Sequence, residues 1–166
     1  MELTPQGTLA ERLRAGGSGI GAFYTPTGVG TMIAEGGLPW RYGTDGSVAM
    51  SSPAKETRRF GACDMVLEQA ISADYALIRA AKVDRHGNAI FRAAARNFNP
   101  IAAMAGRITI VEAETVVDTG EINPDDVHLP GIFVDTVVAL TPREASDKAI
   151  EKITTRTPAR DLSGPR

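Results

Sequence analysis

The sequence predicts an α/β fold in which short strands alternate with short helices. Brief apolar runs recur between segments of helical pattern, and this alternation is typical of layered α/β domains. Seventeen Gly and ten Pro indicate many turns, more than a helical bundle needs. A length of 166 residues suits one domain with a core large enough to be stable alone.

Composition disfavours several classes of function. Lys and Arg number 18 against 20 Asp and Glu, and the formal net charge of -2 disfavours nucleic acid as a partner. No apolar run approaches the roughly 20 residues of a membrane helix, and no secretory signal follows Met1, so we expect no membrane association. The single cysteine, Cys63, excludes an internal disulfide framework and a cysteine-cluster metal site, and it favours a reducing, cytoplasmic location.

The first helix, about two turns long, is expected between Thr8 and Gly16-Gly17. The Thr8 hydroxyl can accept a hydrogen bond from an unpaired N–H, and Glu11 stands at the reciprocal position of a capping box. Gly16-Gly17 then ends the helix.

Strands are expected where short apolar, β-branched or aromatic runs occur. Asp45-Gly46 between two such runs is a strong hairpin signal. The run 108–111 is apolar and β-branched, the pattern of a strand buried on both faces of a sheet, and a short helix over residues 100–106 precedes it. The strands are expected over residues 20–25, 40–42, 47–50, 65–67, 75–78, 90–92, 108–111 and 133–138, while 68–71 are ambiguous.

The C-terminal segment differs in character from the rest. From Thr141 onward the chain is charged, contains Pro and shows no periodicity. We therefore expect a domain over residues 1–140 and a loose, charged tail over residues 141–166, with a short helix around residues 145–153.

Gln6 is the first candidate for chemistry. It lies just before the first helix, where a side-chain amide and free backbone N–H groups can donate to an oxygen that gains negative charge. A carboxylate, a thioester carbonyl or a phosphate would suit such a site. The alternative is a capped turn with Gln6 in solvent, which the residues alone favour.

A glycine-rich loop over residues 25–31 is the second candidate. Thr25, Gly28 and Gly30 would let the backbone approach a ligand closely, because glycine has no Cβ. The loop lacks the lysine of a P-loop and the full dinucleotide-binding spacing. A plain tight turn explains it equally well.

Asn97 and Asn99 are the third candidate, since with Arg96 they can bind an anion beside a helix start. The structural alternative, in which Asn99 caps the helix that Pro100 opens, is favoured.

No complete catalytic set is evident. His86 and His128 each lie beside a turn and are expected to have surface or hydrogen-bonded structural roles. Cys63 has no neighbouring histidine, and no serine nucleophile elbow occurs. The residues alone therefore indicate an α/β domain with anion-friendly loops and no self-sufficient active site.

Six runs carry a family resemblance. The most specific are ELTPQGTLAERLRAGG at 2–17 and AFYTPTGVGT at 22–31. DYALI, DRHGN, ARNFNP and HLPGIFV follow in order, so the resemblance covers nearly all of residues 2–140. Together these runs resemble the A (alpha) subunit of family I 3-oxoacid CoA-transferases. An isomerase of sugar phosphates on the same fold is disfavoured, because a local acid/base set is missing.

The resemblance implies a CoA-transferase-like mixed sheet flanked by helices and a ping-pong reaction. Coenzyme A would move from an acyl-CoA donor, such as succinyl-CoA, to a 3-oxo acid such as acetoacetate or 3-oxoadipate. The attacking glutamate belongs to the B (beta) subunit in that family, and no Glu here matches its motif. Coenzyme A is substrate, so no resident cofactor and no metal are implied. The implied substrate-binding residues are Gln6, Thr25, Gly28, Gly30, Asn97 and Asn99.

This sequence also departs from the family. An intact alpha subunit carries a half before Glu2, with a Gly-Gly-Phe motif and an Asn-containing loop, that has no counterpart here. The chain therefore resembles a partial alpha subunit, incomplete at its N-terminus, with exposed strand edges and apolar surface. The CoA-transferase beta subunit, acyl-CoA and the 3-oxo acid are the expected partners, within an oligomer. The alternative is a truncated, non-catalytic remnant or assembly partner that binds the beta subunit or itself without turnover.

Overall fold

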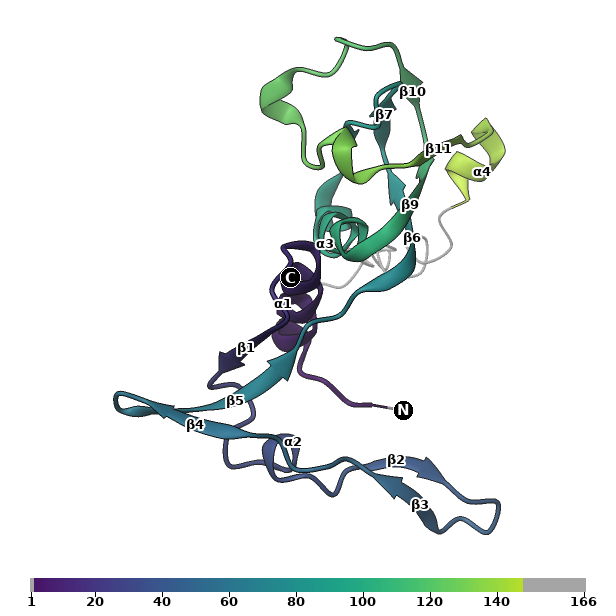
Figure 1. The fold of residues 1–166 in the computed structure, drawn as a ribbon. Coiled ribbons are helices and arrows are strands. Elements are labelled where there is room, and N and C mark those ends of the chain that lie inside the picture. Colours follow the sequence, from purple (N-terminus) through teal and green to yellow (C-terminus); the bar gives the residue numbers. More distant parts are fainter. Residues whose placement is uncertain (1, 148–166) are drawn as a thin grey trace, which may run out of the picture.

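The computed structural model describes residues 2–147. The molecule is elongated (Figure 1). A small parallel sheet lies at one end and two β-hairpins lie at the other, while helices α1 (Gln6–Gly17) and α3 (Asn99–Ala105) lie between them. Helices and strands both contribute to the fold, so the α/β prediction is confirmed.

Helix α1 starts earlier than expected, because Pro5 rather than Thr8 precedes its first residue. The predicted capping role of Thr8 is therefore wrong: Thr8 lies inside the first turn and is buried, and its hydroxyl has no hydrogen-bond partner within the part of the chain that is described. The predicted end at Gly16-Gly17 is confirmed. There the Ile20 N–H donates to the carbonyl of Ala15 at 2.9 Å and turns the chain back along the helix.

A three-stranded antiparallel sheet follows, in the order β1-β5-β4. Strand β1 (Ala22–Thr25) confirms the first predicted strand, and β5 (Cys63–Gln69) is longer than predicted. Residues 68 and 69, ambiguous in the sequence, belong to β5 because Glu68 pairs with Phe23 and Gln69 with Ala22. Strand β4 (Thr57–Phe60) was not predicted, since all of its residues are exposed and it shows no apolar alternation.

The second hairpin confirms the signal from Asp45-Gly46. Strands β2 (Pro39–Tyr42) and β3 (Val48–Ser51) pair antiparallel around it. A short helix α2 (Met32–Glu35), which was not predicted, connects β1 to this hairpin.

The parallel sheet has the order β11-β9-β6. Strand β6 (Ala73–Ala80), helix α3 and the central strand β9 (Gly106–Ala113) form a crossover, and β11 (Thr136–Ala139) adds to the far side. The expectation that residues 108–111 are buried on both faces is wrong. Thr109 and Val111 are buried beneath α3, whereas Ile108 and Ile110 on the opposite face are only half-buried.

The sheet's covered face is the main core of the described residues. Ile78, Val83, Phe91, Val111 and Leu129 are among its buried members. Several short elements cover this core. They are strands β7 (Lys82–Asp84), β8 (Ala89–Ile90) and β10 (Val116–Val117), and the 3₁₀ helices Ala93–Arg96, Pro124–Asp126 and Gly131–Phe133.

The turn after β7 is held by the buried carboxylate of Asp84. It accepts hydrogen bonds from the N–H groups of His86 and Asn88 at 2.9 Å each, and from the Asn88 amide at 2.8 Å. Burial favours the neutral acid, but these hydrogen bonds outweigh it and hold the pKa of Asp84 below its ordinary value. The side-chain Oδ1 of Asn88 then accepts the Gly131 N–H at 2.9 Å, which holds the segment before β11 against this turn.

This arrangement predicts an acid-sensitive contribution to stability. Since the folded-state pKa of Asp84 is depressed, its contribution is present above about pH 4, the ordinary carboxyl value, and is lost as the pH falls through the folded pKa. We expect Asp84→Asn to lower the free energy of unfolding at pH 7 and to flatten its decline on acidification. Denaturant unfolding at pH 7 and pH 3 checks this, and parallel declines in the two proteins would contradict it.

The C-terminal part is ordered further than expected. Helix α4 (Pro142–Ser146) begins at a capping box in which the Thr141 hydroxyl accepts the Glu144 N–H while the Glu144 carboxylate accepts the Thr141 N–H. The prediction of a loose segment from residue 141 is therefore wrong for residues 141–146, where the Thr-x-x-Glu pattern signals a helix start. The expected helix around 145–153 and the tail beyond lie mostly outside the described residues.

Candidate functional site

Gln6 is the first residue of α1, and its side chain is exposed. The first helical hydrogen bond runs from the Leu9 N–H to the Pro5 carbonyl at 2.9 Å, and no side chain caps the helix. The N–H groups of Gln6, Gly7 and Thr8 are thus the unpaired donors of the first turn. The Gln6 amide, these donors and the positive end of the helix dipole together favour an anion or a developing oxyanion.

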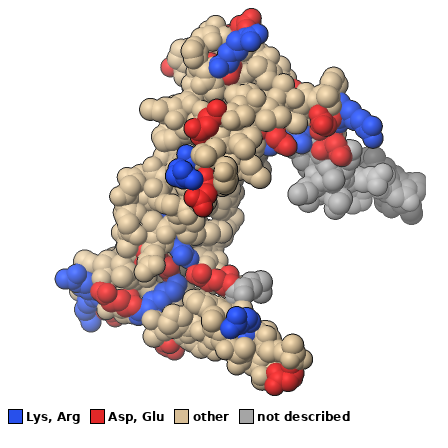
Figure 2. Space-filling model, turned by 45° about the vertical axis from the view of Figure 1, so that its right-hand side comes forward, with Lys and Arg blue, Asp and Glu red and all other residues tan. Residues whose placement is uncertain are grey.

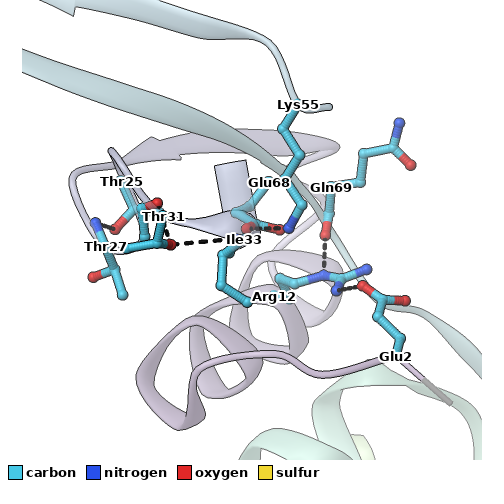
Figure 3. A network of polar contacts seen from close by, with 10 residues as sticks. Glu2, Arg12, Thr25, Thr27, Thr31, Ile33, Lys55, Glu68 and Gln69 are labelled. Atoms are coloured by element: carbon cyan, nitrogen blue, oxygen red, sulfur yellow. Dashed lines mark hydrogen bonds and ion pairs between the residues drawn. The ribbon is translucent and has the colours of Figure 1, made fainter. Parts of the chain in front are cut away.

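The glycine-rich loop is a defined structure (Figure 3). The Thr25 hydroxyl accepts the Thr27 N–H at 3.2 Å, and the Thr31 hydroxyl donates to the Gly28 carbonyl at 2.7 Å and accepts the Ile33 N–H at 3.2 Å. Gly28 and Gly30 have φ values of +93° and +70°, a conformation that side chains with a Cβ rarely adopt. Thr31 thus closes the loop and also starts α2.

Gln6 and this loop lie at the same end of the α1–β1 unit. Arg12 contacts Gln69, and Gln69 pairs with Ala22, so the middle of α1 is level with the start of β1. From that level the helix extends back to Gln6 over about 9 Å, and β1 extends forward to Thr25 over about 10 Å. Because β1 runs in the opposite direction to α1, both paths lead toward the hairpin end of the molecule (Figure 1).

Asn97 and Asn99 lie elsewhere, where α3 meets the parallel sheet. The side-chain Oδ1 of Asn99 accepts the Arg79 backbone N–H at 3.2 Å, and its side-chain Nδ2 donates to the Ala95 carbonyl at 2.7 Å. The predicted cap is wrong: Asn99 is the first residue of α3, Phe98 precedes it, and Asn99 instead ties the helix to β6. The Asn97 side chain is exposed, and a binding role for either residue remains a prediction.

A pocket of about 320 Å³, not foreseen from the sequence, lies between α1, β2, β5 and the segment before β4. Its floor carries the ion pair between the Lys55 ammonium and the Glu68 carboxylate, 2.6 Å apart, and Glu68 is only 2% exposed. Arg12 donates to the Gln69 carbonyl at 2.7 Å and pairs with Glu2 at 2.9 Å (Figure 3). The lining residues are Glu2, Arg12, Trp40, Pro53, Ala54, Lys55, Glu56, Leu67, Glu68 and Gln69.

The acids of this pocket are engaged in structural contacts. Glu68 is held by Lys55, and Glu56 accepts a hydrogen bond from the Tyr24 hydroxyl. That bond to a carboxylate raises the pKa of Tyr24, because it stabilises the neutral phenol. Spacing could not reveal these pairs, since strand register brings the partners together. Within the described residues, the ion pair and the hydrogen bond hold these side chains in place. They form a fixed wall of the pocket rather than an activated nucleophile.

The histidines have the roles expected of them where contacts define one. The Nδ1 atom of His128 accepts the Phe91 N–H at 3.0 Å, so this half-buried ring has a structural role. Residues 2–147 bring together no group of three or more His, Cys, Asp or Glu suited to a metal. None of the helices in that range has the length and apolar character needed to cross a bilayer.

Comparison with known proteins finds a family and relatives that agree with one another. Residues 1–140 match the coenzyme A transferase family. The A subunit of the probable succinyl-CoA:3-ketoacid coenzyme A transferase of Mycobacterium tuberculosis is 61% identical over 156 residues, which is 94% of this chain and 62% of that protein. The mitochondrial succinyl-CoA:3-ketoacid coenzyme A transferase 2A of mouse is 52% identical over 94% of this chain and 29% of its own length. The chain thus spans less than two thirds of these curated relatives.

Solved structures share the fold. Glutaconate coenzyme A-transferase from Acidaminococcus fermentans superposes with a TM-score of 0.67 at 20% identity, covering 88% of this chain and 47% of that one. The acyl-CoA transferase YdiF of Escherichia coli O157:H7, in a thioester complex with CoA, superposes with a TM-score of 0.64 at 25% identity, covering 84% of this chain and 27% of its own.

Proposed function

Because this chain belongs to the coenzyme A transferase family, we propose that it supplies part of the alpha subunit of a succinyl-CoA:3-ketoacid CoA-transferase. The 61% identity to the A subunit of the mycobacterial enzyme carries the proposal. The partner would be a beta subunit, and the substrates would be succinyl-CoA and a 3-oxo acid. Coenzyme A enters as substrate, so the scheme needs no resident cofactor. The exposed thiol of Cys63 suits a reducing cytoplasm.

The proposed reaction is a ping-pong transfer through a glutamate of the beta subunit. Its carboxylate attacks the acyl carbonyl of succinyl-CoA, the thiolate of CoA leaves, and an acyl anhydride remains. The thiolate then attacks the glutamyl carbonyl, which releases succinate and leaves a glutamyl-CoA thioester. The carboxylate of the 3-oxo acid then takes the place of succinate, the same steps run in reverse, and the 3-oxo acid leaves as its CoA thioester. A CoA thioester is also what the YdiF structure contains, and that supports the intermediate.

In this scheme Gln6 stabilises charge at the acyl group. Its exposed amide lies at an uncapped helix start, where unpaired N–H groups add further donors. The loop of Thr25, Gly28 and Gly30 forms the adjoining wall at the same end of the α1–β1 unit. The nearby carboxylate of Glu68 is held by Lys55, and this supports the proposal that the attacking carboxylate belongs to another chain.

Substitution of Gln6 tests this role in an assembly reconstituted with the beta subunit of the mycobacterial relative and the complementary part of its alpha subunit. We expect Gln6→Ala to lower kcat/KM by about tenfold to a hundredfold, because one donor to a developing oxyanion is lost. Gln6→Glu should be at least as harmful, since a carboxylate repels that charge. Succinyl-CoA to acetoacetate transfer is the measurement.

Glu11→Ala is the matched control, because Glu11 lies on the exposed side of the same helix and pairs only with Arg14 there. It should remain within about twofold of the unchanged protein. Kinetics unaltered by both Gln6 substitutions would remove Gln6 from the site.

The second candidate is an assembly partner without turnover. The observation that favours it is the open edge and face of the parallel sheet, where Tyr75 is 60% and Leu77 77% exposed. In this case the chain would bind the beta subunit or itself, and the Gln6 substitutions would change nothing. A homodimer indifferent to acyl-CoA would favour this candidate over the first.

A further inference from the structure

The start of α1 is weakly held by its own contacts. No side chain caps the helix, and its first helical hydrogen bond is the one from the Leu9 N–H to the Pro5 carbonyl at 2.9 Å. The Gln6 side chain is exposed, so packing does not fix it. Helix ends fray when few contacts hold them. The place of the Gln6 amide therefore depends on what holds the backbone around it.

Arg12 supplies that hold, because it joins the segment before α1 to strand β5 (Figure 3). Its Nε donates to the Gln69 carbonyl at 2.7 Å, and its Nη1 pairs with the Glu2 carboxylate at 2.9 Å. The backbone carbonyl of Arg12 also accepts the Ile71 N–H at 2.9 Å. The Arg12 side chain is only 14% exposed. One enclosed residue thus fastens both the helix and the segment that enters it.

The ion pair closes a loop around the helix start. Glu2 lies four residues before Gln6, and Arg12 lies six residues after it. The contact between the Glu2 and Arg12 side chains therefore places Gln6 within a closed loop of residues 2–12. A short closed loop has few backbone conformations open to it. Because β5 pairs with β1, which leads into the glycine-rich loop, the Arg12 anchor also sets the place of Gln6 relative to that loop.

We propose that Arg12 is a positioning residue for Gln6 and acts together with Glu2 through this closed loop. The proposal rests on the role proposed above for Gln6. A donor to a developing oxyanion must be placed closely, since a shift of about 1 Å can cost about a hundredfold in rate. Arginine suits the task better than lysine, because a guanidinium holds its Nε and Nη donors in one rigid plane and can engage two partners at once.

The exposure of Glu2 indicates that the ion pair contributes more to position than to stability. The Glu2 side chain is 44% exposed. Figure 2 shows acidic and basic side chains side by side across the hairpin end of the molecule. Solvent and neighbouring charges weaken an ion pair in such surroundings, so it adds little to the free energy of unfolding. Loss of the pair should therefore alter turnover more than thermal unfolding.

Hydrogen exchange in the full chain, followed by NMR, tests the anchor without any transfer of CoA. We expect Glu2→Ala and Arg12→Lys to speed exchange at the Leu9 amide about threefold to tenfold, because the first turn of α1 opens more readily. Arg14→Lys is the matched control on the same helix, since Arg14 pairs with Glu11 at the exposed surface. It should change this rate less than about twofold, and the Tm of all three variants should stay within about 4 °C of the unchanged protein.

Kinetics in the reconstituted assembly test the link to Gln6. We expect Arg12→Lys to lower kcat for succinyl-CoA to acetoacetate transfer about threefold to tenfold and to change KM less than about twofold, because the lost interaction is made in the transition state. In the Gln6→Ala background the same substitution should lower kcat less than about twofold, since no amide is left to position. Arg14→Lys should leave kcat unchanged in both backgrounds.

Either of two results would overturn the proposal while leaving the proposed function intact. Equal exchange rates at Leu9 in Arg12→Lys and Arg14→Lys would show that the guanidinium does not hold the helix start. Losses of kcat that multiply when Arg12→Lys and Gln6→Ala are combined would show that Arg12 acts apart from Gln6. Transfer unaltered by Gln6→Ala alone is a different result, because it would refute the role of Gln6 and its positioning together.

Discussion

Replacing Gly16 by alanine should destabilise the chain by about 3 kcal/mol. A Cβ at Gly16 would lie 2.0 Å from the Ile71 carbonyl oxygen and 2.8 Å from its carbon. Those atoms are backbone and cannot rotate aside. Helix α1 would have to move away from Ile71, whose N–H donates to the Arg12 carbonyl at 2.9 Å. Denaturant unfolding of the two proteins is the measurement.

Gly7→Ala is the control on the same helix. No atom lies within 4 Å of a Cβ built at Gly7. Alanine is the better helix former by up to about 1 kcal/mol, so this substitution should be neutral or stabilising. If Gly16→Ala also left stability unchanged, the close contact of α1 with Ile71 would be wrong.

Breaking the buried ion pair of the pocket should have the second largest effect. Lys55→Met leaves the Glu68 carboxylate without its cation, and the Glu68 side chain is only 3% exposed. Losing one partner of a buried pair costs about 3–5 kcal/mol, and we expect about 2–3 kcal/mol because Lys55 is itself 21% exposed. The double variant Lys55→Met/Glu68→Leu should recover part of that loss, because it removes the unpaired charge.

Arg85→Met provides the comparison at an exposed pair. Arg85 and Asp118 are 2.6 Å apart, with side chains 73% and 69% exposed. Solvent screens such a pair, so the free energy of unfolding should fall by less than about 1 kcal/mol. Urea unfolding measures both variants. If Lys55→Met and Arg85→Met lowered the free energy of unfolding equally, the pair of Lys55 and Glu68 would not be a buried one.

The elements that could be predicted from the sequence are those with a local signal. Gly16-Gly17 ends α1, Asp45-Gly46 turns a hairpin, and the apolar run 108–111 forms the middle of β9. Strand β4 could not be predicted, because its four residues are exposed and pairing with β5 alone defines it. Burial of 108–111 on both faces was expected from its composition, but a layer that would cover the second face is not among the described elements.

The loops of the candidate site could be predicted from the sequence, but its pocket could not. Gly28 and Gly30 have the left-handed backbone that glycine permits, and Gln6 lies at a helix start. The pair of Lys55 and Glu68 depends on strand register, which residue spacing does not encode. The family was predicted from several motifs that occur in the same order, and the match over residues 1–140 confirms it.

Mass spectrometry of the intact polypeptides tests the central claim most directly. The assembly of this chain, its complementary segment and the beta subunit would be incubated with succinyl-CoA without acceptor, and each polypeptide would be weighed. The account predicts a CoA adduct on the beta subunit, with none on this chain, together with no transfer by this chain alone. An adduct of CoA on a carboxylate of this chain, or transfer catalysed by the chain in isolation, would contradict it.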